Sequence, residues 1–375
     1  MPRSLYILVV ALLLVFGNCF AWQTANAKPF RLIYVDSGPY KEYRQIIKGL
    51  ALGLKKHGLI DNCLLPMAND MESLEGMWAW LSVNAGGDKI EFLADGFYTA
   101  NHSHERWAEI LEEIMKRIRE RKDVDGILSL GSWASKDIAK LDTDVPVIVC
   151  GVTNAVEAEI VPSINDSGKD SLVAIVFPNR IKNQVEIFHR VFNFKKMGIA
   201  YDDSDAGRNS IGLKEIEQAT HDLNIELVRC TNTFSIEDVN LAAERLAQCH
   251  KQLVQENVDA VYLTYNVALT KETMPKVLKP LLDAKLPTFS QQGKNDVRNG
   301  ALMSVSDGSS DRLEGVICAN LLSKIIDGVM PRKLKQSFNP QLKLYLNLHN
   351  ACIIGWNPSL EVLVIVDNFY STDVY

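Results

Sequence analysis

Two short stretches of the chain share one pattern. Residues 124–132 read VDGILSLGS and residues 258–266 read VDAVYLTYN, so each opens with Val-Asp, runs through strand-forming residues and ends at a polar residue. A helical stretch and a second apolar strand follow each copy, VPVIVCGVTN at 145–154 and LPTFSQQGKN at 286–295. The repetition predicts a chain with two halves of the same architecture.

Strands and helices alternate through both halves. In the first half, strand patterns at 28–38 and 89–97 are separated by an amphipathic helix, and a second amphipathic helix covers 104–123. In the second half the same alternation runs over 171–295. Strands separated by helices of about 10 to 20 residues are typical of βαβ units with parallel sheets. The sequence therefore predicts an α/β fold of two doubly wound parallel-sheet lobes.

The C-terminal part of the chain is expected to complete both lobes. An amphipathic helix pattern at 311–331 is followed by mixed strand and helix patterns up to the end of the chain. We predict a first lobe of residues 28–154 plus 310–342 and a second lobe of residues 155–309 plus 343–375. Several segments crossing between two lobes form a multi-strand hinge.

Residues 1–27 have the pattern of a secretory signal peptide. They carry Arg3, an apolar run of about a dozen residues and an Ala-Asn-Ala ending at Ala27. Two alternatives are a retained membrane anchor, for which the run is short against the roughly 20 residues of a span, and lipid attachment at Cys19. Cleavage before Lys28 predicts a periplasmic protein.

The charge of the mature chain restricts its partners. Removing Arg3 with the signal peptide leaves 39 basic residues against 46 acidic ones, a formal charge of −7. This balance gives no basic surface for nucleic acid and no attraction to an anionic membrane. We expect a monomer that binds a small solute and meets a membrane only through a partner protein.

Cysteines are scattered through the mature chain rather than clustered. Cys150, Cys318 and Cys352 lie inside apolar strand or helix patterns, which is typical of buried thiols. Cys230 and Cys249 end a predicted strand and the helix after it, and they are the one pair considered for a disulfide.

Polar and aromatic residues follow the predicted strands. In an open parallel sheet, ligands bind outside the carboxyl ends of the strands, so these residues are the candidate solute-binding set. Loops are polar by default, and the alternative for Trp133 is packing against its own lobe. The candidates from the two lobes are Asp36, Ser129, Ser132, Trp133, Thr153 and Asn154, then Tyr201, Asp202, Ser204, Tyr265, Asn266, Gln291, Ser306 and Asp307.

Familiar catalytic motifs are absent from the sequence. It has no G-x-S-x-G elbow, no Walker loop and no G-x-G-x-x-G after a strand, so no enzyme activity and no cofactor are predicted. His102 and His104, with Glu105 or Asp95, could be proposed as metal ligands. Two histidines at this spacing are more typical of a polar helix start, and no metal site is predicted.

The order of these segments resembles a known family. The stretches VDGILSLGSWAS, VPVIVCGVTN, MGIAYDDSD, VDAVYLTYN, LPTFSQQGK, NGALMSVSDGSSDRLEG and LNLHNACIIGWNP are similar, over most of residues 30–370, to ABC transporter substrate-binding proteins that include tryptophan and tyrosine binders. The resemblance implies a type I periplasmic-binding fold, a solute held between the lobes, and delivery to a membrane permease with its ATPase. The chain departs from the family at Asn154-Ala155, Ala174-Ile175 and Asn266, all on the ligand side.

The residues and the resemblance together predict a solute class. Hydroxyls, amides and helix-start N–H groups can hold a carboxylate, aspartates can meet an ammonium, and Trp133, Tyr201 and Tyr265 can supply apolar faces. We expect a small amphipathic metabolite, such as an aromatic or other amino acid. The alternative is a sensory binding protein with the same cleft that presents its occupied state to a receptor kinase.

Overall fold

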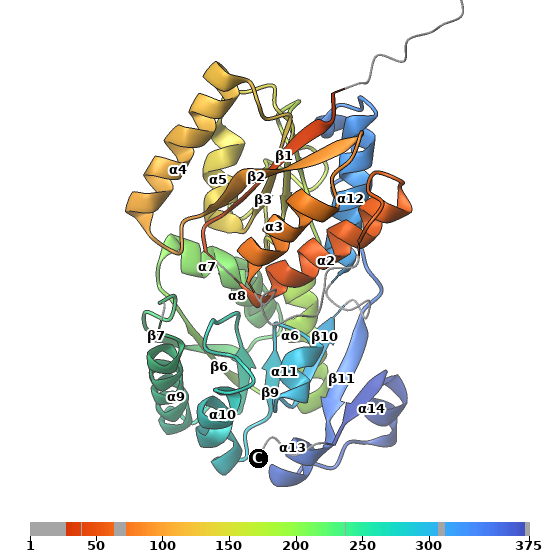
Figure 1. The fold of residues 1–375 in the computed structure, drawn as a ribbon. Helices are drawn as coiled ribbons and strands as arrows, with labels where there is room; N and C mark the ends of the chain where they lie inside the picture. The colour runs from red at the N-terminus through yellow and green to blue at the C-terminus, as the bar shows by residue number, and fades with distance from the viewer. Residues whose placement is uncertain (1–27, 39, 64–72, 237, 307–311, 372–375) are drawn as a thin grey trace, which may run out of the picture.

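The protein folds into two α/β lobes, one above the other in Figure 1. The computed structural model describes residues 28–38, 40–63, 73–236, 238–306 and 312–371. The predicted signal peptide with Cys19, and Asp307, lie outside these residues. Each lobe is built on one sheet with helices on both faces, which confirms the predicted fold class of two doubly wound lobes.

The first lobe contains a sheet with the strand order β2-β1-β3-β4-β5, and all of its strand pairs are parallel. The central strands are buried on both faces, as expected for strands that helices cover on either side. The strands are β1 (Phe30–Asp36), β2 (Ile90–Thr99), β3 (Gly126–Leu130), β4 (Val147–Cys150) and β5 (Leu172–Ala174).

Two groups of helices cover this sheet. Apolar residues of α2 and α12 pack with α3 on one face, and residues of α4 and α5 pack on the other. The apolar stripe of α2, at Ile46, Leu50 and Leu54, is fully buried. These helices are α2 (Lys41–Lys56), α3 (Leu74–Asn84), α4 (His104–Lys116), α5 (Ser132–Lys140) and α12 (Leu313–Ile326).

Glycines let α2 and α12 approach closely. A Cβ atom at Gly315 would lie 2.0 Å from the Ile46 carbonyl oxygen, and one at Gly49 would lie 2.1 Å from the Arg312 carbonyl oxygen. Only glycine fits at both positions. The contact holds a helix from late in the sequence against the first helix of the fold, so the first lobe depends on both parts of the chain.

The second lobe contains a sheet with the order β12-β11-β10-β9-β8-β6-β7. Its strand pairs are parallel except for β10 with β11, which are antiparallel. The strands are β6 (Lys196–Tyr201), β7 (Glu226–Thr231), β8 (Ala260–Leu263), β9 (Thr288–Ser290), β10 (Met303–Ser306), β11 (Lys343–Asn347) and β12 (Asn368–Tyr370).

Helices cover both faces of the second sheet as well. Residues of α6, α8 and α13 pack in one core, and residues of α9 and α10 pack in the other. The helices are α6 (Arg180–Phe192), α7 (Asp205–Ile211), α8 (Leu213–Asp222), α9 (Val239–Gln255), α10 (Met274–Asp283), α11 (Lys294–Arg298), α13 (Leu348–Ile353) and α14 (Leu360–Ile365). In Figure 1, α7 and α8 lie at the top of this lobe, facing the first one.

The chain crosses between the lobes more than once. It leaves the first sheet after β5, returns to pack α12 on α2, and passes into the second sheet again at β11. Strand β5 pairs with β4, so the first crossing comes later than the boundary predicted after residue 154. The apolar run at 171–177 suits a buried strand of either sheet, and sequence periodicity does not say which sheet a strand joins.

A disulfide joins Cys230, in β7, to Cys249, in α9. It ties the edge strand of the second sheet to the helix that follows it. Cys150 and Cys318 are buried thiols, as predicted, whereas Cys352 is exposed. Cys352 lies on the outer side of α13, although the apolar residues around it in the sequence predicted that it would be buried.

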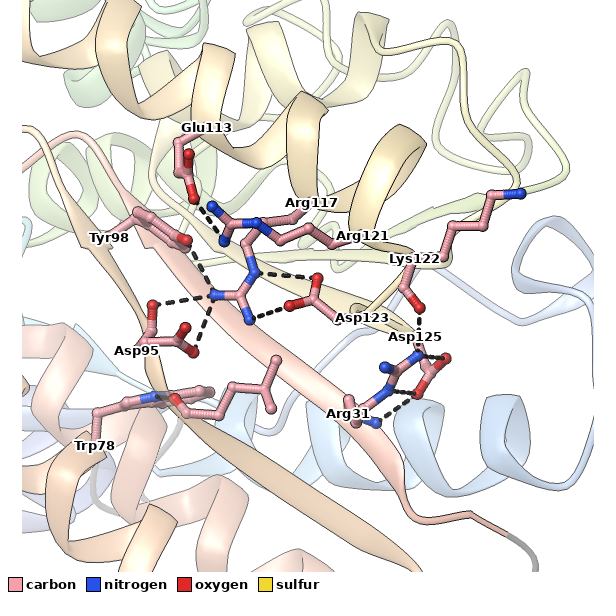
Figure 2. Close-up of polar contacts among 11 residues, drawn as sticks. Arg31, Trp78, Asp95, Tyr98, Glu113, Arg117, Arg121, Lys122, Asp123 and Asp125 are labelled. Atoms are coloured by element: carbon pink, nitrogen blue, oxygen red, sulfur yellow. Dashed lines mark hydrogen bonds and ion pairs between the residues drawn. The ribbon is translucent and has the colours of Figure 1, made fainter.

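A buried arginine holds the edge of the first lobe together. Arg117 follows α4 in a π-helical turn, Arg117–Arg121, and its side chain is only 2% exposed. Its guanidinium donates to Asp123 at 3.2 and 3.0 Å, to the Tyr98 hydroxyl at 3.1 Å and to the Asp95 carbonyl at 3.1 Å (Figure 2). The network connects α4 to β2 and to the start of β3.

Candidate functional site

A cavity of about 770 Å³ lies between the lobes. We call it the cleft cavity. Residues after β3 and β4 line it from the first lobe, and residues after β6, β7, β8 and β9 line it from the second. This is the carboxyl side of both parallel sheets, where ligands of open α/β folds bind. The volume lies within the range of about 300–1,000 Å³ that is usual for small-molecule sites.

Most of the predicted site residues meet at this cavity. From the first lobe, Trp133 and its neighbours at the start of α5 contribute, and from the second lobe the residues just after β6, β8 and β9 do so. Their assignment as ligand contacts stays a prediction. The predicted residues that line the cavity are Ser132, Trp133, Thr153, Asp202, Ser204, Tyr265, Gln291 and Ser306.

Asp36 and Ser129 lie inside the first lobe instead. Both side chains are fully buried and outside the cavity lining. The Asp36 carboxylate accepts hydrogen bonds from the Tyr34 and Thr99 hydroxyls, each at 2.5 Å, and the Ser129 hydroxyl lies 2.9 Å from that of Ser135. Burial raises the pKa of Asp36 to about 6. These two residues end strands but point into the lobe.

Asn154, Tyr201 and Asn266 also lie outside the lining. The Asn154 amide donates to Glu215 at 2.6 Å, which joins the two lobes, and the Asn266 side chain accepts from the Ala268 N–H at 2.9 Å within a turn. Tyr201 packs in the core of the second lobe. Each of them therefore has a role within the protein itself.

An aromatic cluster, Tyr40, Tyr43, His102 and Tyr265, forms one part of the wall. Ring centroids lie 5.4 Å apart for Tyr40 and Tyr43, 5.4 Å for Tyr40 and His102, and 4.9 Å for Tyr40 and Tyr265. The Tyr265 hydroxyl donates to the Glu42 carboxylate at 2.7 Å across the lobes. Of these residues only Tyr265 was predicted, because Tyr40 and Tyr43 precede and begin an ordinary amphipathic helix.

The loop that carries His102 has an unusual backbone. Asn101 and His102 both adopt left-handed conformations, with φ of 47° and 62°. Such conformations cost free energy in residues other than glycine and gather at functional sites. The loop places the His102 ring so close to Gly38 that a Cβ atom there would lie 2.4 Å from the ring.

The two histidines contact different aromatic residues. His102 lies against Tyr40, and the His104 ring centroid lies 4.2 Å from that of Trp133. Within the described ranges, no group of three or more His, Cys, Asp or Glu side chains could hold a metal ion. Both histidines line the wall of the cleft cavity.

The start of α5 opens onto the cavity without a side-chain cap. Its N-cap is Gly131, with φ of 82°, followed by Ser132 and Trp133 in the lining. A Cβ atom at Gly131 would lie 2.2 Å from the Tyr43 hydroxyl, so the position requires glycine. Uncapped N–H groups at a helix start favour acceptor oxygens and negative charge.

The start of α6 is different because the protein fills it. The Glu215 carboxylate accepts from the N–H groups of Ile181 and Lys182, at 3.1 and 3.3 Å, as well as from Asn154. Burial raises the pKa of Glu215 above its ordinary value. This helix start is therefore occupied by a carboxylate of α8.

Polar groups of the second lobe complete the wall. The Gln184 amide donates to the carbonyls of Gln291 and Val305, both at 3.3 Å, and Gln184 also bonds the Tyr262 hydroxyl. Gln292 lines the cavity, and its buried Oε1 atom has no hydrogen-bond partner among the residues that the structure describes. An unpaired buried acceptor is costly, so this atom suits a donor group of a ligand.

Hydrogen bonds join the lobes beside the cavity. The Thr153 hydroxyl donates to the Ser210 carbonyl at 2.6 Å, and the Lys214 N–H donates to Glu157 at 3.2 Å. With the Asn154–Glu215 and Tyr265–Glu42 bonds, these contacts hold the lobes together in the structure. A separation of the lobes would break them.

The fold and the cavity define a two-lobed solute-binding protein of the first periplasmic-binding type. The family model described as ABC transporter substrate binding protein matches residues 86–367. The chain belongs to this family. Among curated protein sequences, none matches it.

Solved structures share the fold at low sequence identity. A conserved domain protein from Vibrio cholerae has a TM-score of 0.68 and 18% identity, covering 91% of this chain and 100% of that one. An ABC domain from Streptococcus pneumonia in complex with L-Trp has a TM-score of 0.66 and 16% identity, with the same two coverages. A solute binding protein from R. palustris in complex with benzoate has a TM-score of 0.54 and 12% identity, covering 85% and 92%.

Within the described residues, no helix combines the length and the apolar character that a membrane crossing requires.

Family membership supports a solute-binding role, with an ABC permease as the partner protein.

Proposed function

We propose that the protein is the exported solute-binding component of an ABC importer. It captures a small amphipathic metabolite, such as an aromatic or other amino acid, between its lobes and delivers it to a membrane permease with its ATPase. The observation that carries the proposal is the cleft cavity, which combines an aromatic cluster with polar groups that the protein leaves open.

The aromatic cluster receives the apolar part of the solute. Tyr40, Tyr43 and Tyr265 present ring faces and edges from both lobes, and Trp133 adds a further surface. Offset or edge contacts with an aromatic solute contribute about 0.5–1.5 kcal/mol beyond the burial of area. The L-Trp and benzoate bound by two structural neighbours support an aromatic ligand.

The open polar groups receive the rest of the solute. The N–H groups at the start of α5, with the Ser132 hydroxyl, donate to acceptor oxygens. The unpaired Oε1 atom of Gln292 accepts from an ammonium or another donor. Asp202 adds negative charge, although its carboxylate already accepts from Phe234 and Ser235.

Binding closes the lobes because the solute touches both of them only in the closed state. A ligand shifts such an equilibrium by no more than its difference in affinity for the two states. The hydrogen bonds between the lobes, which the structure shows, belong to this closed state.

The disulfide supports the proposed location. Disulfides persist in oxidising compartments such as the bacterial periplasm, and the Cys230–Cys249 bond fits a chain exported by a cleaved signal peptide. We propose that the mature protein begins at Lys28 and acts as a monomer.

A thermal-shift screen of amino acids, nucleobases, sugars and metal ions tests the proposal. At about 100 times its dissociation constant, the right solute stabilises the fold by roughly 2.7 kcal/mol and raises the melting temperature. Tyr265→Ala is expected to weaken the hit, and X-ray scattering is expected to show compaction. A response to metal ions alone, or a hit unaffected by Tyr265→Ala, contradicts the proposal.

The importer role has its own test. The protein with its solute is expected to stimulate ATP hydrolysis by the permease and ATPase encoded beside it. A gene neighbourhood that encodes a receptor kinase and no permease favours a sensory role instead.

A further inference from the structure

The acidic side chains that line the cleft cavity all have hydrogen-bond partners. Glu42 accepts from the Tyr265 hydroxyl, Glu314 from the Gly151 N–H, Asp202 from Phe234 and Ser235, and Asp203 from Arg208. Each of these carboxylates is therefore hydrogen-bonded within the protein, and Asp203 is also paired with the Arg208 guanidinium.

Arg180 is the exception among the charged residues. It is the first residue of α6 and the one lysine or arginine in the described lining. Its side chain makes no hydrogen bond and no ion pair with any residue that the structure describes. Glu215 lies near enough to interact electrostatically, but its carboxylate is already bonded to Asn154 and to the start of α6.

The helix fixes where Arg180 faces. Residues three and four apart share one face of a helix, so Arg180, Asn183 and Gln184 lie together, and all three line the cavity. Gln184 is buried and anchored to the carbonyls of Gln291 and Val305. The Asn183 side chain, like that of Arg180, has no hydrogen-bond partner in the described part of the chain.

We propose that Arg180 is the specificity-determining residue that recognises an oxyanion of the solute, with Asn183 as a neighbouring donor. This rests on the proposed function and narrows the solute to organic acids. A guanidinium is charged at all relevant pH values and binds the two oxygens of a carboxylate or phosphate side by side. Within the described residues the half-buried guanidinium has no hydrogen-bond acceptor, and an acidic solute supplies one on binding.

Matched probes and variants test the proposal. The acidic probes are L-tryptophan and benzoate for the carboxylate source and phenyl phosphate for the phosphate source; the uncharged or amidated counterparts are tryptophanamide, benzamide and phenol. Calorimetry measures their affinity for the wild type, Arg180→Gln and Arg180→Lys. Arg190→Gln is the control, because it removes the same charge from an exposed position of the same helix.

The wild type is expected to prefer at least one acidic probe over its counterpart. Arg180→Gln is expected to weaken the affinity for that probe by about tenfold to a hundredfold, the value of about one hydrogen bond to a charged group. Arg180→Lys keeps the charge without the paired geometry, so its affinity for the probe is expected to lie between those of the wild type and Arg180→Gln. Arg190→Gln is expected to bind as the wild type does.

Equal affinity of Arg180→Gln and the wild type for the acidic probe overturns the proposal and leaves the proposed function intact. Binding of the three counterparts, tryptophanamide, benzamide and phenol, without binding of any acidic probe also overturns it. Binding of no probe in this panel or in the broader screen contradicts the proposed function as well. Because Arg180→Lys retains length and charge, it reports on recognition even if Arg180→Gln folds poorly.

Discussion

Two arginine sites in this molecule differ in what surrounds them. Arg117 is buried at the edge of the first lobe, and Asp123, Tyr98 and Asp95 occupy its guanidinium (Figure 2). Arg180 lies in the wall of the cleft cavity, where no described residue bonds its side chain. A guanidinium saturated by its own protein stabilises the fold, whereas an unsaturated one in a cavity is available to a ligand. The comparison separates stability from binding.

The largest expected effect on stability comes from Arg117→Met. It leaves Asp123 without its partner and removes several hydrogen bonds, so the free energy of unfolding is expected to fall by about 3 to 4 kcal/mol. Breaking a buried ion pair usually costs about 3 to 5 kcal/mol, and the lower part of that range applies because the Asp123 side chain is 30% exposed. Chemical denaturation measures the loss, and Arg121→Met, at an exposed ion pair, is expected to cost less than about 1 kcal/mol. Equal losses for the two variants would contradict the structural role of Arg117.

Removing the disulfide is expected to cost about 3 kcal/mol, because it closes a loop of 19 residues. The double variant Cys230→Ser, Cys249→Ser is expected to unfold at lower denaturant while its affinity for the solute stays that of the wild type. Since the bond lies outside the lining of the cavity, a large loss of affinity in the folded variant would show that stability and binding are not separable there.

Asp36, a buried group outside the cavity lining, allows a pH-dependent test of the separation between stability and binding. Its pKa in the folded protein, about 6, lies above its ordinary value of 3.8 because burial disfavours the charge. The protonated group contributes stability that is fully present below pH 3.8 and is lost as the pH rises through about 6. Relative to Asp36→Asn, the wild type is expected to lose up to about 1.4 kcal/mol per pH unit across that window.

Denaturation curves for both proteins at a series of pH values measure this difference. Since Asp36 lies outside the lining, Asp36→Asn is expected to bind the solute normally. A flat difference between the two proteins would mean that the buried carboxyl is not what titrates.

The smallest expected effect on stability is that of Arg180→Gln. A side chain with no partner in the described structure contributes little to the fold, so the free energy of unfolding without solute is expected to change by less than about 0.5 kcal/mol. A loss close to that of Arg117→Met would show that Arg180 supports the fold and would remove the basis of the comparison.

The architecture could be predicted because it follows from local patterns. Alternating strands and helices define parallel sheets, and the strand-end rule locates the cavity between the lobes. Trp133, Asp202, Tyr265 and Gln291 were found in this way, and all four line the cavity.

The remaining site residues could not be predicted because side-chain direction is not a local property. Asp36 and Ser129 sit at strand ends, but a shift of one residue decides whether a side chain faces the cavity or the lobe. Tyr40 and Arg180 lie at the starts of helices, where sequence gives no sign of the opposite lobe. Their roles depend on contacts between residues that are far apart in the chain.

The crystal structure of the complex with the strongest acidic binder tests the central claim most directly. We predict that the solute lies in the cleft cavity, with its apolar part against Tyr40 and Tyr265 and its oxyanion on Arg180, so that it touches both lobes. A solute bound outside the cavity, or in contact with one lobe only, would contradict the account.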